Sequence, residues 1–258
     1  MPPEQTLAAL TSRLRPVTLD EVLAAANLQA RVDRKYVVPR ECLSAVLDRV
    51  GDQFQVLEID QLREFRYESV YFDTPELLTY YQHAHGRRRR SKIRTRAYLD
   101  SGECLLEFKR VGSRGETIKE RFPYRFDSRF ALDAEARALV LDRLGSTIDA
   151  PTLGPSLTTT YLRTTLVDTV RGNRMTCDVD LRFEGPAGGS YGPIQGVVVV
   201  ESKSMGGDSA ADRTLRRMGA RPVSLSKYCV GMAVLDRRLP ANRWNRELRT
   251  YFSWSPER

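Results

Sequence analysis

Charged side chains recur at every second position in several short stretches of the sequence. Lys92, Arg94 and Arg96 are spaced in this way, and the same spacing relates Glu107 to Lys109. The pattern recurs in Lys119–Arg121, in Glu201–Lys203 and in the set Arg31, Asp33 and Lys35. Because successive side chains of a β-strand point to opposite faces, each set lies on one face of its strand. Such faces have the chemistry needed to bind a chain of phosphates.

An ordinary antiparallel sheet with one face in water can carry the same alternation. A solvated face, however, usually mixes Ser, Thr, Gln and Lys, whereas these strands present mainly Arg and Lys with one or two carboxylates each. Burying unpaired cations costs several kcal/mol per ion, so the positive charge must meet carboxylates, water or an anionic ligand. The pattern therefore predicts a charged interior that holds phosphate.

The carboxylates within these strands are candidate ligands for Mg²⁺ or Mn²⁺, which prefer oxygen ligands and bridge carboxylates to substrate phosphates. Glu201 is the best candidate because it follows the uncharged run Val197–Val200, where an ionised group needs a specific partner. Glu107 is a second candidate, with Asp178 or Asp180 as a further one. Charge-balancing of neighbouring bases is an equal alternative for each acid. Phosphoryl transfer suits the set, since it requires alignment of phosphates and neutralisation of charge.

The composition fits a polyanionic partner without identifying it. The chain has 258 residues and a formal net charge of +8, which favours nucleic acid, phospholipid, nucleotide or polyphosphate. Cys42, Cys104, Cys177 and Cys229 form no CxxC pair, so we expect reduced thiols and a cytoplasmic protein. Neither a signal peptide nor a run of eighteen apolar residues is present, so we expect no membrane-spanning segment.

The order of the predicted elements indicates an α+β fold with an antiparallel eight-stranded β-barrel tunnel and peripheral helices. The strands are expected at 31–38, 67–73, 92–99, 103–110, 116–126, 157–168, 174–183 and 197–204. Helices are expected at 5–28 with a break at Pro16, and at 39–50, 75–86, 132–144, 208–218 and 228–235. We expect one domain over 1–258, with 1–30 as an N-terminal helical segment and 240–258 as a C-terminal tail.

With these residues in place, the chain resembles the VTC domain, the catalytic domain of vacuolar transporter chaperone polyphosphate polymerases, within the triphosphate tunnel metalloenzyme superfamily. The resemblance covers residues 31 to 235. Its motifs, in order, are RVDRKYVV at 31–38, YFDT at 71–74, SKIRTRAY at 91–98, LLEFKR at 105–110, IKERF at 118–122, TYLRT at 160–164, CDVDL at 177–181, VVESKS at 199–204 and SKY at 226–228.

This resemblance implies that the protein is an ATP-polyphosphate phosphotransferase, which transfers the γ-phosphate of ATP to a growing polyphosphate chain inside a basic tunnel. The expected phosphate-binding residues are Lys35, Arg94, Arg96, Lys109, Lys119, Arg121, Tyr161, Arg163, Arg174, Lys203 and Lys227. The expected catalytic residues are Glu201, Lys109, Arg94 and Arg96, with Mn²⁺ or Mg²⁺ at Glu201 and Glu107. The eukaryotic proteins also carry a regulatory domain and membrane helices, so we expect a stand-alone form that works beside a separate membrane protein.

Two other functions compete with this one. A tunnel-type triphosphatase or cyclase would keep the fold, but the relatives with that chemistry resemble the CYTH group and carry an ExExK signature, whereas this chain reads Arg31-Val32-Asp33-Arg34-Lys35. A non-catalytic polyanion-binding module would instead use the run Arg87–Arg90 with Lys92. That run is equally typical of a solvated loop, and no aromatic RNA-reading motif accompanies it, so we expect no specific nucleic-acid partner.

Overall fold

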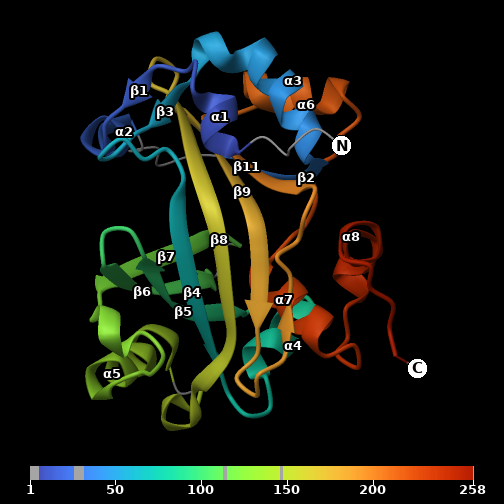
Figure 1. Cartoon of the computed structure of the whole chain (residues 1–258). Coiled ribbons are helices and arrows are strands. Elements are labelled where there is room, and N and C mark those ends of the chain that lie inside the picture. Colours follow the sequence, from blue (N-terminus) through green and yellow to red (C-terminus); the bar gives the residue numbers. More distant parts are fainter. Residues whose placement is uncertain (1–5, 26–31, 113–114, 146–147, 258) are drawn as a thin grey trace. The chain divides into compact units, whose positions relative to one another are not determined.

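The structure, a computed structural model, describes residues 6–25, 32–112, 115–145 and 148–257 (Figure 1). Arg31, which begins the first expected strand, lies outside the described residues, as does much of the expected N-terminal segment. The chain forms two compact units. Unit 1 comprises Met1–Phe65, Leu162–Asp180 and Ile194–Ser224, and unit 2 comprises Arg66–Tyr161, Leu181–Pro193 and Leu225–Arg258.

A large, mainly antiparallel sheet of 11 strands runs through the fold, and its main path has the order β2-β11-β9-β8-β4-β5-β6-β7. These strands are β2 (Val32–Pro39), β11 (Val197–Ser204), β9 (Asn173–Glu184), β8 (Gly154–Asp168), β4 (Phe65–Asp73), β5 (Ser91–Tyr98), β6 (Glu103–Val111) and β7 (Thr117–Pro123). The mixed helix and strand fold and the eight expected strands are confirmed. Closure of the sheet into a barrel is not confirmed, because β2 and β7, the two ends of this path, do not pair with each other in the described residues.

Short strands that the sequence pattern did not reveal complete the sheet. β1 (Pro16–Val17) pairs in parallel with β3 (Gln55–Leu57), and β10 (Ser190–Tyr191) pairs with β9. Pro16 was expected only to break a helix, but it lies in an edge strand, where its missing N–H costs no ladder hydrogen bond. The expected helix is therefore two short helices, α1 (Leu7–Thr11) and α2 (Leu19–Ala25).

In unit 1, helices α3 (Arg40–Val50) and α6 (Ala210–Arg217) cover the apolar face of the sheet (Figure 1). Leu43, Val46, Leu47 and Val50 recur at helical spacing and are all buried in one cluster. The opposing face of the sheet supplies Met175, Cys177, Val179, Val198 and Val200. The apolar side chains of these strands are thus buried against the helices. The charged side chains, which point to the opposite face of the sheet, make other contacts.

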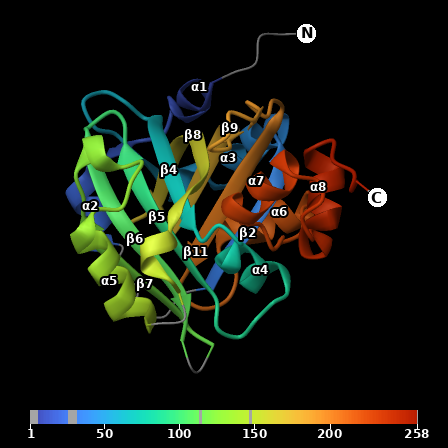
Figure 2. The same ribbon diagram turned by 90° about the horizontal axis from the view of Figure 1, so that it is seen from below.

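In unit 2, helix α5 (Ala134–Leu144) packs on β4, β5 and β6 through Val70, Phe72, Ile93, Leu106 and Phe108 (Figure 2). The remaining helices are α4 (Leu78–Ala84), α7 (Lys227–Leu235) and α8 (Asn245–Tyr251), with 3-10 turns at Gly51–Gln53, Phe126–Ser128, Ala150–Thr152 and Asn242–Trp244. In the tail, Trp244, Leu248, Phe252 and Trp254 are buried. No helix in the described parts of the chain is long and apolar enough to cross a membrane, and the four cysteines are free thiols.

Buried Asp73, at the end of β4, fixes the helices around it. Its carboxylate accepts hydrogen bonds from the backbone N–H groups of Thr79 and Tyr80 at 2.8 and 2.9 Å, and from the Tyr228 hydroxyl at 2.5 Å. The negative charge thus lies at the N-terminal turn of α4, where the helix dipole favours it. One carboxylate holds α4 and the start of α7 against the same strand.

Gly231 in α7 is a position where an added methyl group has no space. A Cβ there would lie 2.5 Å from Phe183 Cδ1 and 2.6 Å from Leu157 Cδ2. We expect Gly231→Ala to lower the free energy of unfolding by about 1–3 kcal/mol, because overpacking outweighs the gain in helix propensity. Denaturant unfolding measures the change. Gly154→Ala is the matched control, since nothing lies within 4 Å of that Cβ, and an equal loss in both variants would contradict the packing argument.

Candidate functional site

Two rows of polar side chains cross the strands of unit 2 on the face opposite α5. In the first, which we call the Glu107 row, Tyr71 of β4 pairs with Arg94 of β5, Arg94 with Glu107 of β6, and Glu107 with Arg121 of β7. In the second, the lysine row, Lys92, Lys109 and Lys119 of β5, β6 and β7 lie side by side. Directly opposite residues have Cβ atoms about 4.5–5.5 Å apart. The alternation in the sequence thus becomes a continuous basic surface.

Glu107 is only 2% exposed and is surrounded by cations. Arg94 Nε donates to its Oε2 at 2.7 Å, and Lys119 Nζ lies 2.6 Å from Oε1. Arg121 Nε lies 3.1 Å from Oε1, and Arg96 Nε lies 3.8 Å from Oε2. Burial opposes ionisation of Glu107, but Arg94, Arg96 and Lys119 outweigh it and hold the pKa of its carboxyl well below its usual range. A single carboxylate therefore serves four basic side chains.

The lysine row adds more positive charge beside this cluster. Like charges directly opposite each other across strands destabilise a sheet, so three adjacent lysines need compensation. Burial, together with repulsion from Arg96, Arg94 and Arg121, lowers the pKa of Lys119 to about 6, against the attraction of Glu107. A phosphate chain would supply further negative charge beside these lysines.

Tyrosines flank the basic rows of unit 2. The Tyr71 hydroxyl accepts a hydrogen bond from Arg94 Nη1 at 2.9 Å. Tyr67 stacks on Tyr161 with ring centroids 5.4 Å apart, and the Lys227 ammonium lies 4.5 Å from the centroid of the Tyr161 ring. Lys227 is the first residue of α7, which begins there because the Ser226 side chain accepts from the backbone N–H of Cys229. The rings hold the ends of Arg94 and Lys227 in position through hydrogen-bond and cation–π contacts.

The charged strands of unit 1 differ because acids and bases alternate there. Lys35 of β2 pairs with Glu201 of β11, and Asp33 pairs with Lys203. Arg174 of β9 pairs with Lys203 from the other side. Lys203 also forms an ion pair with Glu201, and burial of Glu201 is outweighed by Lys203, Lys35 and Arg163, which hold the pKa of its carboxyl well below its usual range.

Arg163 and Asp178 form a separate bidentate pair in unit 1. Arg163 donates from Nε to Oδ1 at 2.6 Å and from Nη2 to Oδ2 at 2.8 Å. Asp178 is 2% exposed, so this pair satisfies a carboxylate that the strand buries. The arrangement explains why a charged residue occurs among Cys177 and Val179. It also leaves Asp178 with little capacity for a cation.

The two expected metal ligands differ in their fitness for the role. Glu107 already meets four cationic side chains, so its surroundings do not fit Mg²⁺ or Mn²⁺. Glu201 fits better, because Lys203, with which it forms a close ion pair, has a flexible side chain that phosphate could attract away. No group of three or more Asp, Glu, His or Cys forms a metal site in the described residues. A metal at Glu201 would thus take its other ligands from phosphate and water, as Mg²⁺ commonly does.

Most residues expected to bind phosphate fall into these two groups. Arg94, Arg96, Lys109, Lys119, Arg121, Tyr161 and Lys227 lie in unit 2, whereas Lys35, Arg163, Arg174, Lys203 and Glu201 lie in unit 1. Sequence reasoning missed Tyr71 and Tyr67, and it recognised the spacing of Lys92 without including this residue among the expected phosphate-binding residues. Tyr67, Ser69 and Tyr71 share one strand face, and Lys92 has the spacing of Arg94 and Arg96, so the same alternation could have identified them. Asp180, paired with Arg40 at 3.8 Å, does not join Glu201.

Binding of tripolyphosphate is expected to take up a proton above about pH 6 because phosphate charge raises the lowered pKa of Lys119. Between that pH and the ordinary lysine pKa of about 10.4, the complex holds Lys119 charged to a greater extent than the free protein does. Affinity therefore falls as pH rises through this interval. Calorimetric titrations near pH 8 in buffers of different ionisation enthalpy measure the uptake.

Lys119→Arg is the matched control for this measurement, because it keeps the charge but does not titrate. We expect the wild type to take up as much as about one proton more than this variant. The comparison cancels the titration of the ligand itself. Equal uptake by the two proteins would contradict the assignment to Lys119.

These features define an α+β protein whose antiparallel sheet carries rows of basic side chains on its strand faces. The chain belongs to the VTC domain family, whose model matches residues 30–236. The match confirms the resemblance inferred from the motifs. A search of curated proteins gives no significant match.

Distant likenesses occur among solved structures. One is to the putative adenylyl cyclase HpAC1 from Hippeastrum, described as having a dominant triphosphatase activity, with 15% identity over 79% of this chain and 96% of that chain and a TM-score of 0.48. The protein PH1012 from Pyrococcus horikoshii OT3 has 13% identity over 74% of this chain and 90% of that chain, with a TM-score of 0.39. A conserved hypothetical protein from Pyrococcus furiosus has 18% identity over 74% and 88%, with a TM-score of 0.37.

Proposed function

We propose that the protein is a polyphosphate polymerase, which transfers the γ-phosphate of ATP to the end of an inorganic polyphosphate chain. The observation that carries the proposal is the excess of cations in unit 2, where Glu107 is the carboxylate for Arg94, Arg96, Lys119 and Arg121, and Lys92 and Lys109 lie alongside. Membership of the VTC domain family supports the same chemistry.

In this proposal the basic rows align phosphates and neutralise their charge. Arg94 and Arg96 present planar guanidinium groups that can contact two phosphate oxygens each, while Lys109 and Lys119 act as point charges. Glu107 keeps these side chains in a fixed arrangement before substrate arrives. Because the donors are already oriented, little reorganisation is needed as charge develops on the transferred group.

The acid of unit 1 has a different role. Glu201 would hold Mn²⁺ or Mg²⁺, which when bound neutralises charge on the phosphates and polarises the bond to the leaving group. Without the metal ion, the positive charges of Lys203 and Lys35 compensate the Glu201 carboxylate. If the metal ion displaces the Lys203 ammonium, the carboxylate still has a positive partner. The bidentate ion pair with Asp178 keeps the Arg163 guanidinium in a fixed orientation.

The products formed from ATP and Mn²⁺ test the proposal. A polymerase makes long polyphosphate chains together with ADP, whereas a triphosphatase releases orthophosphate and a cyclase forms a cyclic nucleotide. Gel analysis of chain length, combined with ADP determination, separates these outcomes. If the purified protein binds polyphosphate but converts no ATP with Mn²⁺ or Mg²⁺, the non-catalytic binding function is correct instead.

A further inference from the structure

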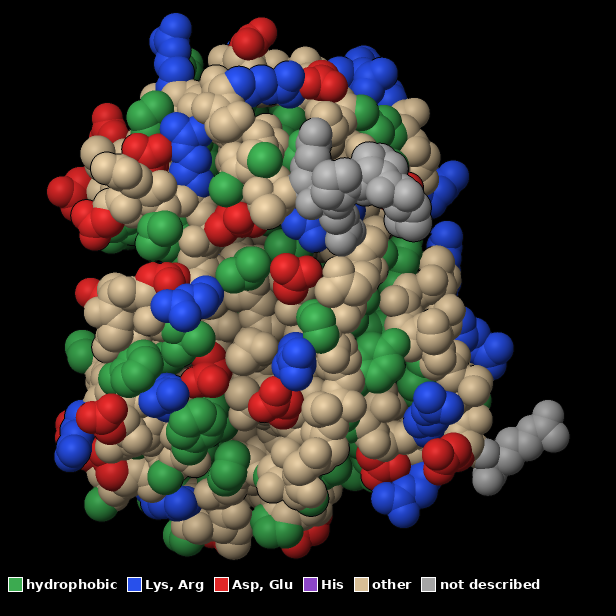
Figure 3. All heavy atoms as spheres, viewed as in Figure 1, with side chains coloured by type: hydrophobic (Ala, Val, Ile, Leu, Met, Phe, Trp, Pro, Cys, Tyr) green, Lys and Arg blue, Asp and Glu red, His purple; other side chains and the backbone are tan. Residues whose placement is uncertain are grey.

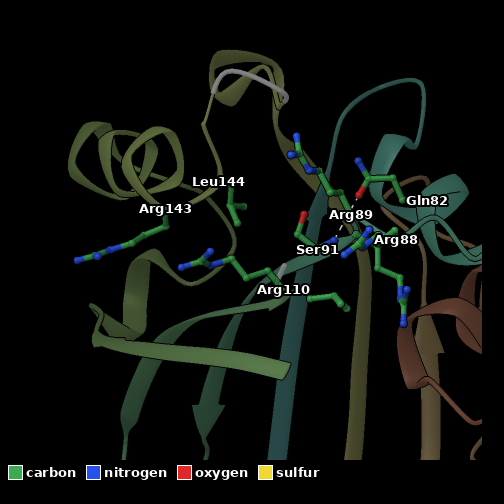
Figure 4. A pocket seen from close by; sticks show the side chains of 10 residues that line it. Gln82, Arg88, Arg89, Ser91, Arg110, Arg143 and Leu144 are labelled. Carbon is green, nitrogen blue, oxygen red and sulfur yellow. Dashed lines mark hydrogen bonds between the residues drawn. The ribbon is translucent and has the colours of Figure 1, made fainter. Parts of the chain in front are cut away.

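A second basic site lies in unit 2, in a pocket of about 470 Å³. Its lining comes from α4, the loop before β5, the end of β6 and the end of α5 (Figure 4). The lining residues are Gln82, Arg88, Arg89, Arg90, Ser91, Arg110, Val111, Gly112, Arg143 and Leu144. A volume of this size is typical of sites for small ligands. The pocket contains Arg88, Arg89 and Arg90 of the arginine run that the strand spacing left unexplained.

The pocket and the lysine row lie on opposite faces of the sheet. Ser91 pairs with Arg110, whereas the next pair along the same two strands is Lys92 with Lys109. Because side chains alternate, Arg110 shares a face with Phe108, which packs in the α5 cluster. Lys109 shares the other face with Glu107. The pocket is therefore distinct from the rows that we propose for phosphoryl transfer.

The charge of the pocket is strongly positive. Among the described residues that line it, five are arginines and none is acidic. Partial compensation comes from two carboxylates outside the lining: Asp142 lies 3.3 Å from Arg143 Nε, and Glu120 lies 3.6 Å from Arg110 Nε and 3.5 Å from Arg143 Nε. Arg110 Nε is buried and has no hydrogen-bond acceptor among the described residues. On the surface in Figure 3, by contrast, acidic and basic side chains are interspersed.

The lining also restricts the kind of anion. Proteins that bind single-stranded nucleic acid combine positive charge with aromatic rings on which bases stack, but none of the lining residues that the structure describes is aromatic. Gln82 and Ser91 are the neutral polar side chains there, and the Gln82 side chain is engaged by the Ser91 backbone N–H at 3.3 Å. Guanidinium groups in this number suit a compact ligand with several phosphate oxygens.

We propose that this pocket is a second anion site that binds a short condensed phosphate, such as the triphosphate group of a free inorganic chain or of a nucleotide. The proposal is independent of the reaction at the Glu107 and lysine rows. The arginines of this pocket would thus bind a condensed phosphate, as we propose for the Glu107 and lysine rows, but on the opposite face of the sheet.

Titration of the protein with tripolyphosphate in metal-free buffer tests this proposal. We expect two equivalents to bind to the wild type and one to bind to the variant R88Q/R89Q/R90Q. The single variant Arg110→Gln keeps the loop and should weaken the second equivalent about tenfold, the typical effect of losing one charge-assisted hydrogen bond. The triple variant R213Q/R217Q/R246Q removes equal charge from exposed positions outside the pocket, and it should bind two equivalents.

The outcomes separate this site from the proposed enzyme activity. Formation of polyphosphate from ATP should persist in R88Q/R89Q/R90Q, and the binding result stands even if the wild type makes no chains. Competition by ATP at the pocket identifies a nucleotide source, and its absence identifies a free inorganic chain. One equivalent in the wild type, or two in R88Q/R89Q/R90Q, overturns the proposal. So does a pocket-dependent affinity for a thymidine oligonucleotide or anionic phospholipid vesicles that exceeds the affinity for tripolyphosphate.

Discussion

Replacing Glu201 by glutamine is expected to lower metal-dependent phosphoryl transfer by about 10²–10³-fold, because the amide no longer provides a charged ligand to the metal. The same variant should bind tripolyphosphate without metal at least as tightly as the wild type. Glu201 forms an ion pair with Lys203, and loss of the negative charge releases that ammonium for phosphate. Turnover of ATP with Mn²⁺ and metal-free calorimetry give the two readouts.

Asp180→Asn is the matched control for this experiment. It makes the same carboxylate-to-amide change on β9, where Asp180 lies 3.8 Å from Arg40, and Asn tolerates the positive φ of 54° at this position. We expect its activity to be close to that of the wild type. Full activity of Glu201→Gln would exclude Glu201 as the metal ligand, whereas parallel loss in both variants would indicate a general effect of charge.

Replacing Glu107 by glutamine is expected to lower the free energy of unfolding by about 3 kcal/mol, because it leaves several cations around a buried neutral group. For a chain of this size that corresponds to a fall in melting temperature of about 6–12 °C. Since tripolyphosphate restores negative charge, it should raise the melting temperature of the variant more than that of the wild type. Thermal unfolding with and without the ligand measures both effects.

The pH dependence of the same variant provides a second readout. The folded-state pKa of Glu107 is lowered, so its stabilising contribution is complete above the ordinary carboxyl pKa of about 4.3 and is lost as pH falls below it. The difference in stability between wild type and Glu107→Gln should therefore shrink in acid. Glu103→Gln, an exposed change on the same strand, should stay within about 0.5 kcal/mol of the wild type at every pH. A similar loss in the two variants would contradict the role given to Glu107.

Pairings within one hairpin could be anticipated from the sequence. The turn around Asp100-Ser101-Gly102 sets Tyr98 opposite Glu103, and the register then brings Arg94 to Glu107 without further information. The partnership of Tyr71 with Arg94 could not be anticipated, because α4 and its loops separate the two strands. Long connections leave register undetermined until tertiary packing fixes it.

The same limitation applies to the acids. The sequence made Asp178, with Asp180, a further candidate metal ligand among the strand carboxylates, yet Arg163 on the preceding strand satisfies Asp178. Only the lateral alignment of β8 and β9 reveals this partner. Glu107 was likewise weighed as a ligand and as a charge-balancing group, and the convergence of β5, β6 and β7 side chains favours the second role.

Strand β6 contributes neighbouring residues to the two surfaces for which we propose ligands, since Lys109 belongs to the lysine row and Arg110 to the pocket beside α5. Amino-acid replacements can therefore alter either surface independently. A one-residue insertion or deletion in β6 would instead alter both surfaces together. It would turn a lysine ammonium toward the α5 face of the sheet and an apolar ring toward Arg94. The strand should thus tolerate changes of residue type during divergence of the family, while its length stays invariant.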